Sequence, residues 1–419
     1  IKLLFVAPIT SRHIVLGKFL GMMMYGLLMF SVLLVYVILG GCWIESFDWA
    51  AVLTGLLGLY LLFGTYAAIG LFMSTLTTYP IVAAIYMLAL LTFLRFVSGL
   101  WQEYTFVRDI TYWLALDRRA GTFINGMICS EDFLYFVIMT TMFLGFAILK
   151  LQFIRERRSM LSKVGRFLGV FIVAMLLGYV TSRPTLRFYH DSTHTKTNTL
   201  TEASQEIVSK LDGGLKMTTY VNLFGSIYNI TPAKVMADIA RYNSYIRFKP
   251  ETKMDYVFYY YTDTTDGFFA HRFAGKTLSE AAKEMAKFQG VNAKKYVPLS
   301  KVDPDVDLRD EGYRFVVLLE RENGEKTFLR VFNDAQRVPF ETEISAALKR
   351  IGMKLPSVGF LSDHYARTIT GDRNRDYSYM VSEKLYRSAL INQGFDVVDV
   401  KLSRNPQLLD SLDVLVVSE

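Results

Sequence analysis

The chain has 419 residues, which is room for two or three domains, and 52% of them are hydrophobic, above the share of a typical soluble protein. Its net charge of +7 lies mainly in an apolar first part, where residues 1–181 hold 13 Lys and Arg but only 8 Asp and Glu, against 33 and 31 in residues 182–419. These values exclude a single ordinary soluble enzyme and give no support to a nucleic-acid-binding protein, which would gather basic residues on a soluble face.

Five apolar runs are long enough to be considered as membrane-spanning helices. They are residues 19–40, 50–73, 81–100, 133–149 and 167–180. The first two contain no charged residue over 22 and 24 positions, which is not expected of a soluble core helix. The fifth has only 14 residues, a length that also suits a buried helix or a signal-type segment.

The basic residues predict the orientation of these spans. Lys2, Arg12 and Lys18 precede the first run, and six Lys and Arg lie at 150–166, whereas the 41–49 connection has none. This distribution places the N-terminal end and residues 150–166 in the cytoplasm and everything after residue 180 outside. The four tryptophans agree, because they fall at or near the predicted outer ends, where such rings favour the interface.

Two polar features accompany the third span. Arg95 is the only charge inside an apolar run, and it is either a gate or substrate contact or a side chain near the helix end that reaches the interface. The connection 101–132 mixes aromatic residues with isolated charges. It is expected to lie in the outer interface or to re-enter the membrane beside the bundle.

The segment before the first span carries the most informative motif. Residues 1–21 read IKLLFVAPITSRHIVLGKFLG, a short amphipathic helix that Pro8 interrupts, then a turn and the start of a membrane helix. The segment resembles the motif LLLxxPVxxxxIVLGKxLA of type-2 ABC transporter permeases and matches it at Leu3, Leu4, Pro8, Ile9, Ile14, Val15, Leu16, Gly17, Lys18 and Leu20. Residues 64–85 are similar to the family's pattern G-x-F-x-S-S-L-T, with Thr75 where serine is usual. The alternative is an unrelated polytopic protein with a proline-interrupted interfacial helix.

The resemblance covers residues 1–154, about four of the family's six spans. It implies that Leu3, Leu4, Pro8, Ile9 and Lys18 contact a separate ABC ATPase subunit. It also implies a dimeric permease assembly in membrane lipid, ATP bound on the partner subunit and no cofactor in this chain. Because the chain begins at Ile1 and ends at Glu419 directly after an apolar run, we expect a fragment of a longer protein.

After residue 180 the pattern changes to helices and strands of ordinary length. A capping box at 199–202 opens a helix to about 211, and Pro232 starts a helical segment to about 246. Strands are expected at 216–223 and 255–261, and a helix at 278–289. Residues 313–320 and 326–332 are expected to pair as a hairpin across Asn323-Gly324. This alternation predicts an α/β fold.

A second α/β unit is expected from about residue 357. It comprises a strand at 357–361, a helix at 375–392 that Gly394 caps, and strands at 395–400 and 413–418. The order resembles the auxiliary periplasmic subunit of gliding-motility ABC transporters over residues 160–419. The segment Leu361-Ser362-Asp363-His364-Tyr365 stands where that family has a strand followed by TGHGE. His364 matches, whereas Asp363 and Tyr365 depart from the pattern.

Other candidate sites are weak on sequence grounds. Cys42 and Cys129 form no disulfide framework or zinc-type cluster, and His190 and His194 would need further ligands to hold a metal. Gly275-Lys276-Thr277 lacks the first glycine of a P-loop and is better explained as a loop leading into a capped helix. Ser362, Asp363 and His364 contain the residue types of a hydrolytic triad, but neighbours in sequence rarely form one. The aromatic run 256–261 is expected to fill both faces of a buried strand.

These observations predict an α-helical polytopic membrane bundle followed by an extracytoplasmic α/β region of two subdomains, Rossmann-like or thioredoxin-like in character. The expected parts are an incomplete permease at 1–154, a basic cytoplasmic linker at 155–166, an anchor at 167–181 and subdomains at 182–350 and 351–419. The predicted function is the membrane component of an ABC-type export system of the gliding-motility type, in the bacterial inner membrane and without enzymatic activity of its own. The alternatives are a membrane-anchored extracytoplasmic enzyme, with a loop site at Ser362, Asp363 and His364, and a structural scaffold of a motility or secretion complex.

Overall fold

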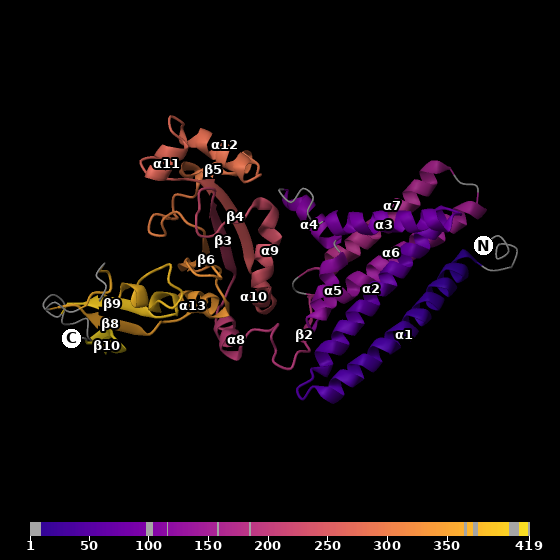
Figure 1. The fold of residues 1–419 in the computed structure, drawn as a ribbon, viewed down its shortest axis with the longest axis horizontal. Helices are drawn as coiled ribbons and strands as arrows, with labels where there is room; N and C mark the ends of the chain where they lie inside the picture. Colours follow the sequence, from indigo (N-terminus) through magenta and orange to yellow (C-terminus); the bar gives the residue numbers. More distant parts are fainter. Residues whose placement is uncertain are drawn as a thin grey trace. The chain divides into compact units, whose positions relative to one another are not determined.

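The computed structural model describes residues 10–97, 104–114, 116–156, 159–183, 186–363, 367–371, 376–401 and 410–417 (Figure 1). The chain folds as two compact units, Ile1–Thr199 and Leu200–Glu419, which we call unit 1 and unit 2. Unit 1 is mainly helical, and unit 2 is a mixed α/β region. The predicted order of an apolar helical part followed by an α/β part is therefore confirmed.

Among the described residues of unit 1, five helices are long and apolar enough to cross a membrane. They are α1 (Ser11–Trp43), α2 (Trp49–Leu76), α3 (Pro80–Val97), α6 (Ser130–Arg155) and α7 (Met160–Thr181). Each contains or overlaps one predicted run. The fifth is longer than its apolar run, because the Ser159 hydroxyl accepts a hydrogen bond from the Ser162 amide and starts the helix at Met160. Residues 160–166 of the basic segment are thus helical.

Helices α2 and α6 form the centre of unit 1, and the other long helices lie around them. Small residues on α2 and α1 allow side chains of neighbouring helices to approach these helices closely. A Cβ atom at Gly58 would lie 2.2 Å from the Phe123 side chain, and one at Gly26 would lie 2.2 Å from Phe63. Thr65 and Thr140 also hydrogen-bond across the α2–α6 contact at 3.1 Å. Close packing of small residues and interhelical hydrogen bonds are what hold helices together where no water is available to drive burial.

The connection after α3 folds against the bundle. It forms α4 (Thr105–Leu114), α5 (Leu116–Ile124) and strand β1 (Met127–Cys129), which pairs antiparallel with β2 (Tyr189–Asp191). Helix α5 contacts α2, α3 and α6, and Phe123 is fully buried. These contacts lie toward the end of the bundle where α2 and α6 begin and α7 ends, which we call the Trp49 end.

Unit 2 is built on a five-stranded sheet of order β5-β4-β3-β6-β7. Its strands are β3 (Leu215–Asn222), β4 (Lys253–Tyr260), β5 (Val297–Pro298), β6 (Val316–Arg321) and β7 (Lys326–Arg330). Strand β3 is parallel to β4 and antiparallel to β6, so that Thr219 stands between Tyr256 and Val317. The predicted hairpin across Asn323-Gly324 is confirmed as the β6–β7 pair.

Helices cover one face of this sheet. The helices of unit 2 are α8 (Glu202–Ser209), α9 (Val235–Ile239), α10 (Asn243–Phe248), α11 (Gly267–Arg272), α12 (Leu278–Phe288), α13 (Glu341–Gly352) and α14 (Ser378–Val381). Val208, Tyr245 and Leu348 from α8, α10 and α13 pack on Met217 and Leu319 of the sheet. The other face packs Tyr220 and Tyr259 against Val302 and Leu308, so the aromatic strand does have both faces packed, as predicted.

A second sheet follows, three-stranded, parallel and of order β10-β8-β9. It consists of β8 (Ser357–Leu361), β9 (Asp396–Val400) and β10 (Val414–Val416). The helix predicted at 375–392 is wrong. Among the described residues of this range, only α14 and the short 3₁₀ helix Leu390–Asn392 are helical, because the buried Asn392 amide donates to the carbonyls of Glu383, Lys384 and Tyr386 and so stabilises turns in place of a helical ladder.

One helix start also differs from the prediction. The residue that caps α8 is Thr201, whose hydroxyl accepts from the Ser204 amide, and not Thr199. The Thr199 hydroxyl instead donates to Asp191 at 3.1 Å. A carboxylate brought near by the fold therefore takes the hydroxyl that the local pattern assigns to a helix cap.

Candidate functional site

Of the residues predicted to contact an ATPase, Leu3, Leu4, Pro8 and Ile9 lie outside the described residues. Lys18 is described, and it is exposed in the second turn of α1. That helix begins immediately after Thr10, whose hydroxyl accepts from the His13 amide. The contact with an ATPase remains a prediction.

The predicted loop site at the end of β8 is described only in part, since His364 lies outside the described residues. The Ser362 amide donates to the Val400 carbonyl at 3.0 Å, and its hydroxyl points to the same oxygen at 3.5 Å. Ser362 and Asp363 are both half-buried. The described contacts of Ser362 continue the β8–β9 pairing, and a hydrolytic role for the three residues stays an untested alternative.

The loop at Gly275-Lys276-Thr277 leads into a helix, as predicted. Thr277 caps α12 in a capping box with Glu280, and Lys276 forms an ion pair with Glu284. The lysine that a phosphate site would need is thus paired with a carboxylate of the same segment. Among the residues that the structure describes, no group of three or more His, Cys, Asp and Glu side chains is placed to hold a metal ion.

The strongest constellation in unit 1 was missed by the sequence analysis. The guanidinium of Arg119 on α5 donates from Nη1 to Glu131 Oε1 and to Asp132 Oδ1, both at 2.7 Å, at the start of α6. Arg187 pairs with Glu131 at 2.8 Å, and the Ser182 hydroxyl donates to Glu131 at 3.0 Å. We call these five residues the charge cluster.

The charge cluster is buried and electrically balanced. The side chains of Arg119, Glu131 and Asp132 are at most 11% exposed, and two cations face two anions. Burial by itself would lower the pKa of Arg119, but the charges of Glu131 and Asp132 outweigh it and raise that pKa. The Arg119 guanidinium also lies 5.2 Å from the centre of the Tyr135 ring. An isolated charge buried in this helical bundle would be costly. Each charged side chain of the charge cluster is therefore stabilised by its oppositely charged partners.

The geometry of the charge cluster ties three segments together. It joins α5, the first turn of α6 and the residues directly after α7, all toward the Trp49 end. Near the same end, Trp113 stacks edge-on against Tyr135, and its ring lies where a side chain at Gly178 of α7 would extend. A sequence signal existed, since the adjacent pair Glu131-Asp132 opens an otherwise apolar run.

The polar stretch after β2, residues 192–199, is a loop of unit 1. Asp191 accepts hydrogen bonds from the amides of Thr193 and Asn198 and from the Thr199 hydroxyl. Burial acts to raise the pKa of Asp191, but these hydrogen bonds outweigh it and hold the pKa below its usual range. The loop also reaches the α1–α2 connection, where the His194 amide donates to Asp48 at 2.7 Å. His190 thus lies in β2, and His194 belongs to a loop stabilised by carboxylates.

Unit 2 contains a groove of about 1000 Å³ where β3 and β4 begin and β6 ends. Its two most buried cations already serve the fold. Lys249 donates to the Leu211 carbonyl at 2.5 Å, and Arg321 donates to the carbonyls of Asp212 and Ile351. These carbonyls follow α8 or end α13, where a positive charge offsets the helix dipole.

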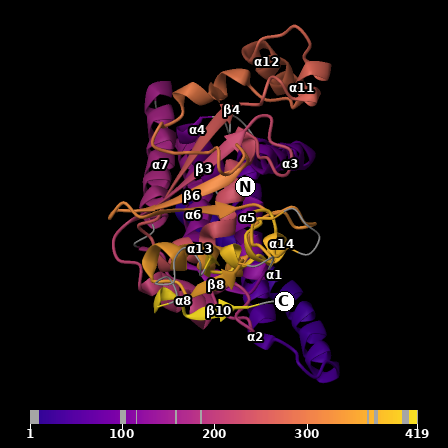
Figure 2. The same cartoon turned by 90° about the vertical axis from the view of Figure 1, so that its left-hand side faces the viewer.

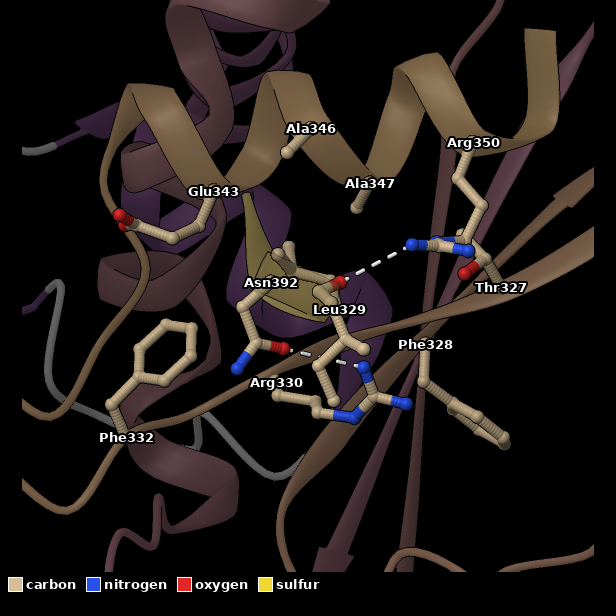
Figure 3. Close-up of a pocket in the computed structure, with 11 residues that line it drawn as sticks. Thr327, Phe328, Leu329, Arg330, Phe332, Glu343, Ala346, Ala347, Arg350 and Asn392 are labelled. Atoms are coloured by element: carbon tan, nitrogen blue, oxygen red, sulfur yellow. Dashed lines mark hydrogen bonds between the residues drawn. The ribbon is translucent and has the colours of Figure 1, made fainter. Parts of the chain in front are cut away.

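A second, small cavity lies between α13, β7 and residues 391–392 (Figure 3). Its volume is about 20 Å³, room for a single water molecule rather than a ligand. Arg330 donates to Asn392 at 3.4 Å and Arg350 to the Ile391 carbonyl at 3.3 Å across it (Figure 3). These contacts join β7 and α13 to the segment that leads into the smaller sheet of unit 2. We call this junction the seam.

Like Glu343, Glu311 is a buried anion of this seam. It is 4% exposed and accepts two hydrogen bonds of 2.8 Å from Arg330 on β7, while Lys384 lies at 3.1 Å. Arg387 forms a parallel link to Glu343 of α13 and to Asp334, both at 2.7 Å. The segment 383–392 is therefore attached to the larger sheet by buried and half-buried ion pairs.

The ion pairs of Glu311 predict that the stability of unit 2 falls in acid. Burial acts to raise its pKa, but the hydrogen bonds and charges of Arg330 and Lys384 outweigh it and hold the pKa below the usual 4.5. Such a carboxylate contributes stability that is complete above pH 4.5 and is lost as the pH falls through the folded-state pKa. We expect hydrogen exchange in β6 and β7, corrected for intrinsic rates, to accelerate as the pH is lowered below this value. In Glu311→Gln this part of the acid dependence should disappear, and an unchanged profile would contradict the assignment.

In the part of the chain that the structure describes, the fold defines the class of the protein as five helices long and apolar enough to span a membrane, followed by a mixed α/β unit. Comparison with known proteins adds no family, since no family model, curated protein or solved structure matches the chain.

Proposed function

We propose that this chain is the membrane component of an ABC-type export system of the gliding-motility type. The observation that carries the proposal is the order of its parts: a segment like the ATPase-contacting motif of type-2 permeases, then a bundle of long apolar helices, then an α/β unit. In this proposal residues 1–154 are the permease part of a dimeric assembly, and the α7 helix anchors the α/β unit. ATP binds to a separate ATPase subunit, and this chain carries no cofactor and no catalytic site.

The location follows from the same proposal. Residues 150–166 face the cytoplasm of a bacterial inner membrane, in keeping with their basic residues, and the Trp49 end faces outward. Unit 2 is then extracytoplasmic and recognises a partner or cargo. In this proposal its two sheets belong to the two α/β subdomains expected at 182–350 and 351–419.

Helix α1 is the element that would transmit the motion of the ATPase. It begins at Ser11, directly after the predicted contact segment, and its 33 residues run without interruption to Trp43, about 50 Å. Of the five long helices it has the lowest buried share, so a rigid shift of α1 disrupts few contacts. Its far end leads into the connection where Asp48 holds the loop of His194. A push at the N-terminal end thereby reaches the Trp49 end as a rigid-body movement.

The proposal predicts that ATP hydrolysis co-purifies with the full chain through its N-terminal segment. Full-length protein isolated from its native membranes in mild detergent should carry an ATPase activity. The double variant Leu4→Glu/Ile9→Glu should lower that activity at least about tenfold, because two buried charges at a hot spot cost more than 1.4 kcal/mol.

The matched control is Met160→Glu/Leu161→Glu. These residues are also apolar and are 76% and 83% exposed in the first turn of α7, which by helix alternation is the same end of the bundle. We expect this control to keep the activity. Equal loss in both variants, or no ATPase activity with the unchanged chain, would refute the proposed coupling.

A further inference from the structure

Basic and acidic residues are unevenly distributed within residues 182–419. Residues 267–301 contain seven Lys and Arg but only two Glu, a net charge of +5, whereas the rest of 182–419 has a net charge of −3. The basic residues therefore gather in one segment of a region that is otherwise weakly acidic. This segment contains α11, α12 and β5.

Helices α11 and α12 lie together at the end of unit 2 next to β5 (Figures 1 and 2). The inner side of α12 is apolar, since Ala281, Ala282 and Ala286 are buried against Phe273, Tyr296 and other core residues. Its outer side carries Lys283 and Lys287, which are exposed and one helical turn apart. We call this outer side, with Arg272, Lys294 and Phe288, the basic surface.

Two features distinguish the basic surface. Among the ion pairs of the described residues, none involves Lys283, Lys287 or Lys294, whereas Lys276 pairs with Glu284. Phe288 is also unusual, because its ring is 73% exposed at the end of α12. The Arg272 guanidinium lies 5.0 Å from the centre of that ring. An exposed aromatic ring among unpaired cations is a pattern of surfaces that bind anionic interfaces.

We propose that the basic surface binds the anionic phospholipid headgroups of a bilayer. Unit 2 is tethered to a membrane, because Leu200 follows directly on a unit with five helices able to span one. The lysines would lie among the phosphates, and Phe288 would enter the boundary between headgroups and acyl chains. A nucleic acid fits less well, since Phe288 alone offers no series of stacking rings. This inference goes beyond the proposed function and holds on either side of the membrane.

The test uses the full chain with Cys42 and Cys129 replaced by serine. A fluorophore sensitive to polarity is attached at Ser279→Cys, an exposed position in the first turn of α12. The protein is reconstituted in vesicles of phosphatidylcholine alone or of phosphatidylcholine with phosphatidylglycerol. We expect a blue shift and protection from an aqueous quencher only with phosphatidylglycerol, and high salt should reverse both.

The variant Lys283→Glu/Lys287→Glu should lower the ratio of docked to undocked protein at least about 25-fold, as about fivefold per lysine predicts. The matched control Lys234→Glu/Lys354→Glu makes the same charge change at two other exposed lysines of unit 2 and should leave the docked population unchanged. The proposal is overturned if phosphatidylglycerol has no effect or if both variants lose docking equally. Protection by an added nucleic acid or acidic protein, with none from phosphatidylglycerol, would also overturn it in favour of a soluble polyanion.

Discussion

Replacing Arg119 by leucine is expected to destabilise unit 1 by about 3–5 kcal/mol, because Glu131 and Asp132 would remain buried without their shared cation. The remaining cation, Arg187, contacts only Glu131 among the two carboxylates. For a unit of this size the change corresponds to a fall in Tm of the order of 10 °C. All four tryptophans of the chain lie in residues 1–199, so tryptophan emission during thermal unfolding in detergent reports on this unit alone.

Two further variants separate the charge from the size of Arg119. Arg119→Leu combined with Glu131→Gln and Asp132→Asn removes the uncompensated anions, and we expect it to recover most of the lost stability. Arg166→Leu removes an exposed arginine from α7 and should change the stability by no more than about 0.5 kcal/mol. If Arg119→Leu is as mild as Arg166→Leu, the charge cluster does not hold α5 to α6.

Replacing Glu311 by leucine is expected to destabilise the seam of unit 2 by about 3–5 kcal/mol. Arg330, whose side chain is 17% exposed, would lose both hydrogen bonds to the carboxylate, and Lys384 would lose its ion pair. Because Lys384 belongs to the segment that joins the two sheets, the loss should be local first. Hydrogen exchange followed by mass spectrometry should show faster exchange in β7 and in residues 383–400 before the rest of unit 2.

The control for this prediction is Glu325→Leu. Glu325 also pairs with an arginine, Arg321, at 2.8 Å, but its side chain is 55% exposed. An ion pair with an exposed partner contributes only about 0.2–1 kcal/mol, so exchange should change little. Equal acceleration throughout unit 2 in Glu311→Leu would show a global loss of stability and contradict a specific role in the seam.

The elements that the sequence predicted well are those whose signal is local. A long apolar run must form a helix if it is to cross a membrane, because every backbone polar group then needs an internal partner. Apolar runs of this length are visible in the sequence, so α1, α2, α3, α6 and α7 could be located from composition alone. The hairpin at Asn323-Gly324 and the cap at Thr277 depend on residues within a few positions of each other.

The failures arose where residues more than one helical turn apart compete for the same groups. Residues 375–392 have a pattern that suits a helix, yet Asn392 and the ion pairs of Lys384 and Arg387 hold them in turns. Thr199 has the position of a cap, but its hydroxyl is taken by Asp191. Such choices depend on which partner the fold brings near, and hydrogen bonds of similar strength cannot be ranked from the sequence.

By itself, therefore, the sequence determined the class of the protein, apolar helices followed by an α/β unit. The reason is that apolar runs and the periodicity of apolar residues are patterns of neighbouring positions in the chain. Only the tertiary structure decided that Arg119 joins Glu131 and Asp132, that Glu311 joins Arg330 and Lys384, and that the cations of α12 remain unpaired. The physical reason is that the strength of a charge depends on its burial and its partners, and both are properties of the folded chain.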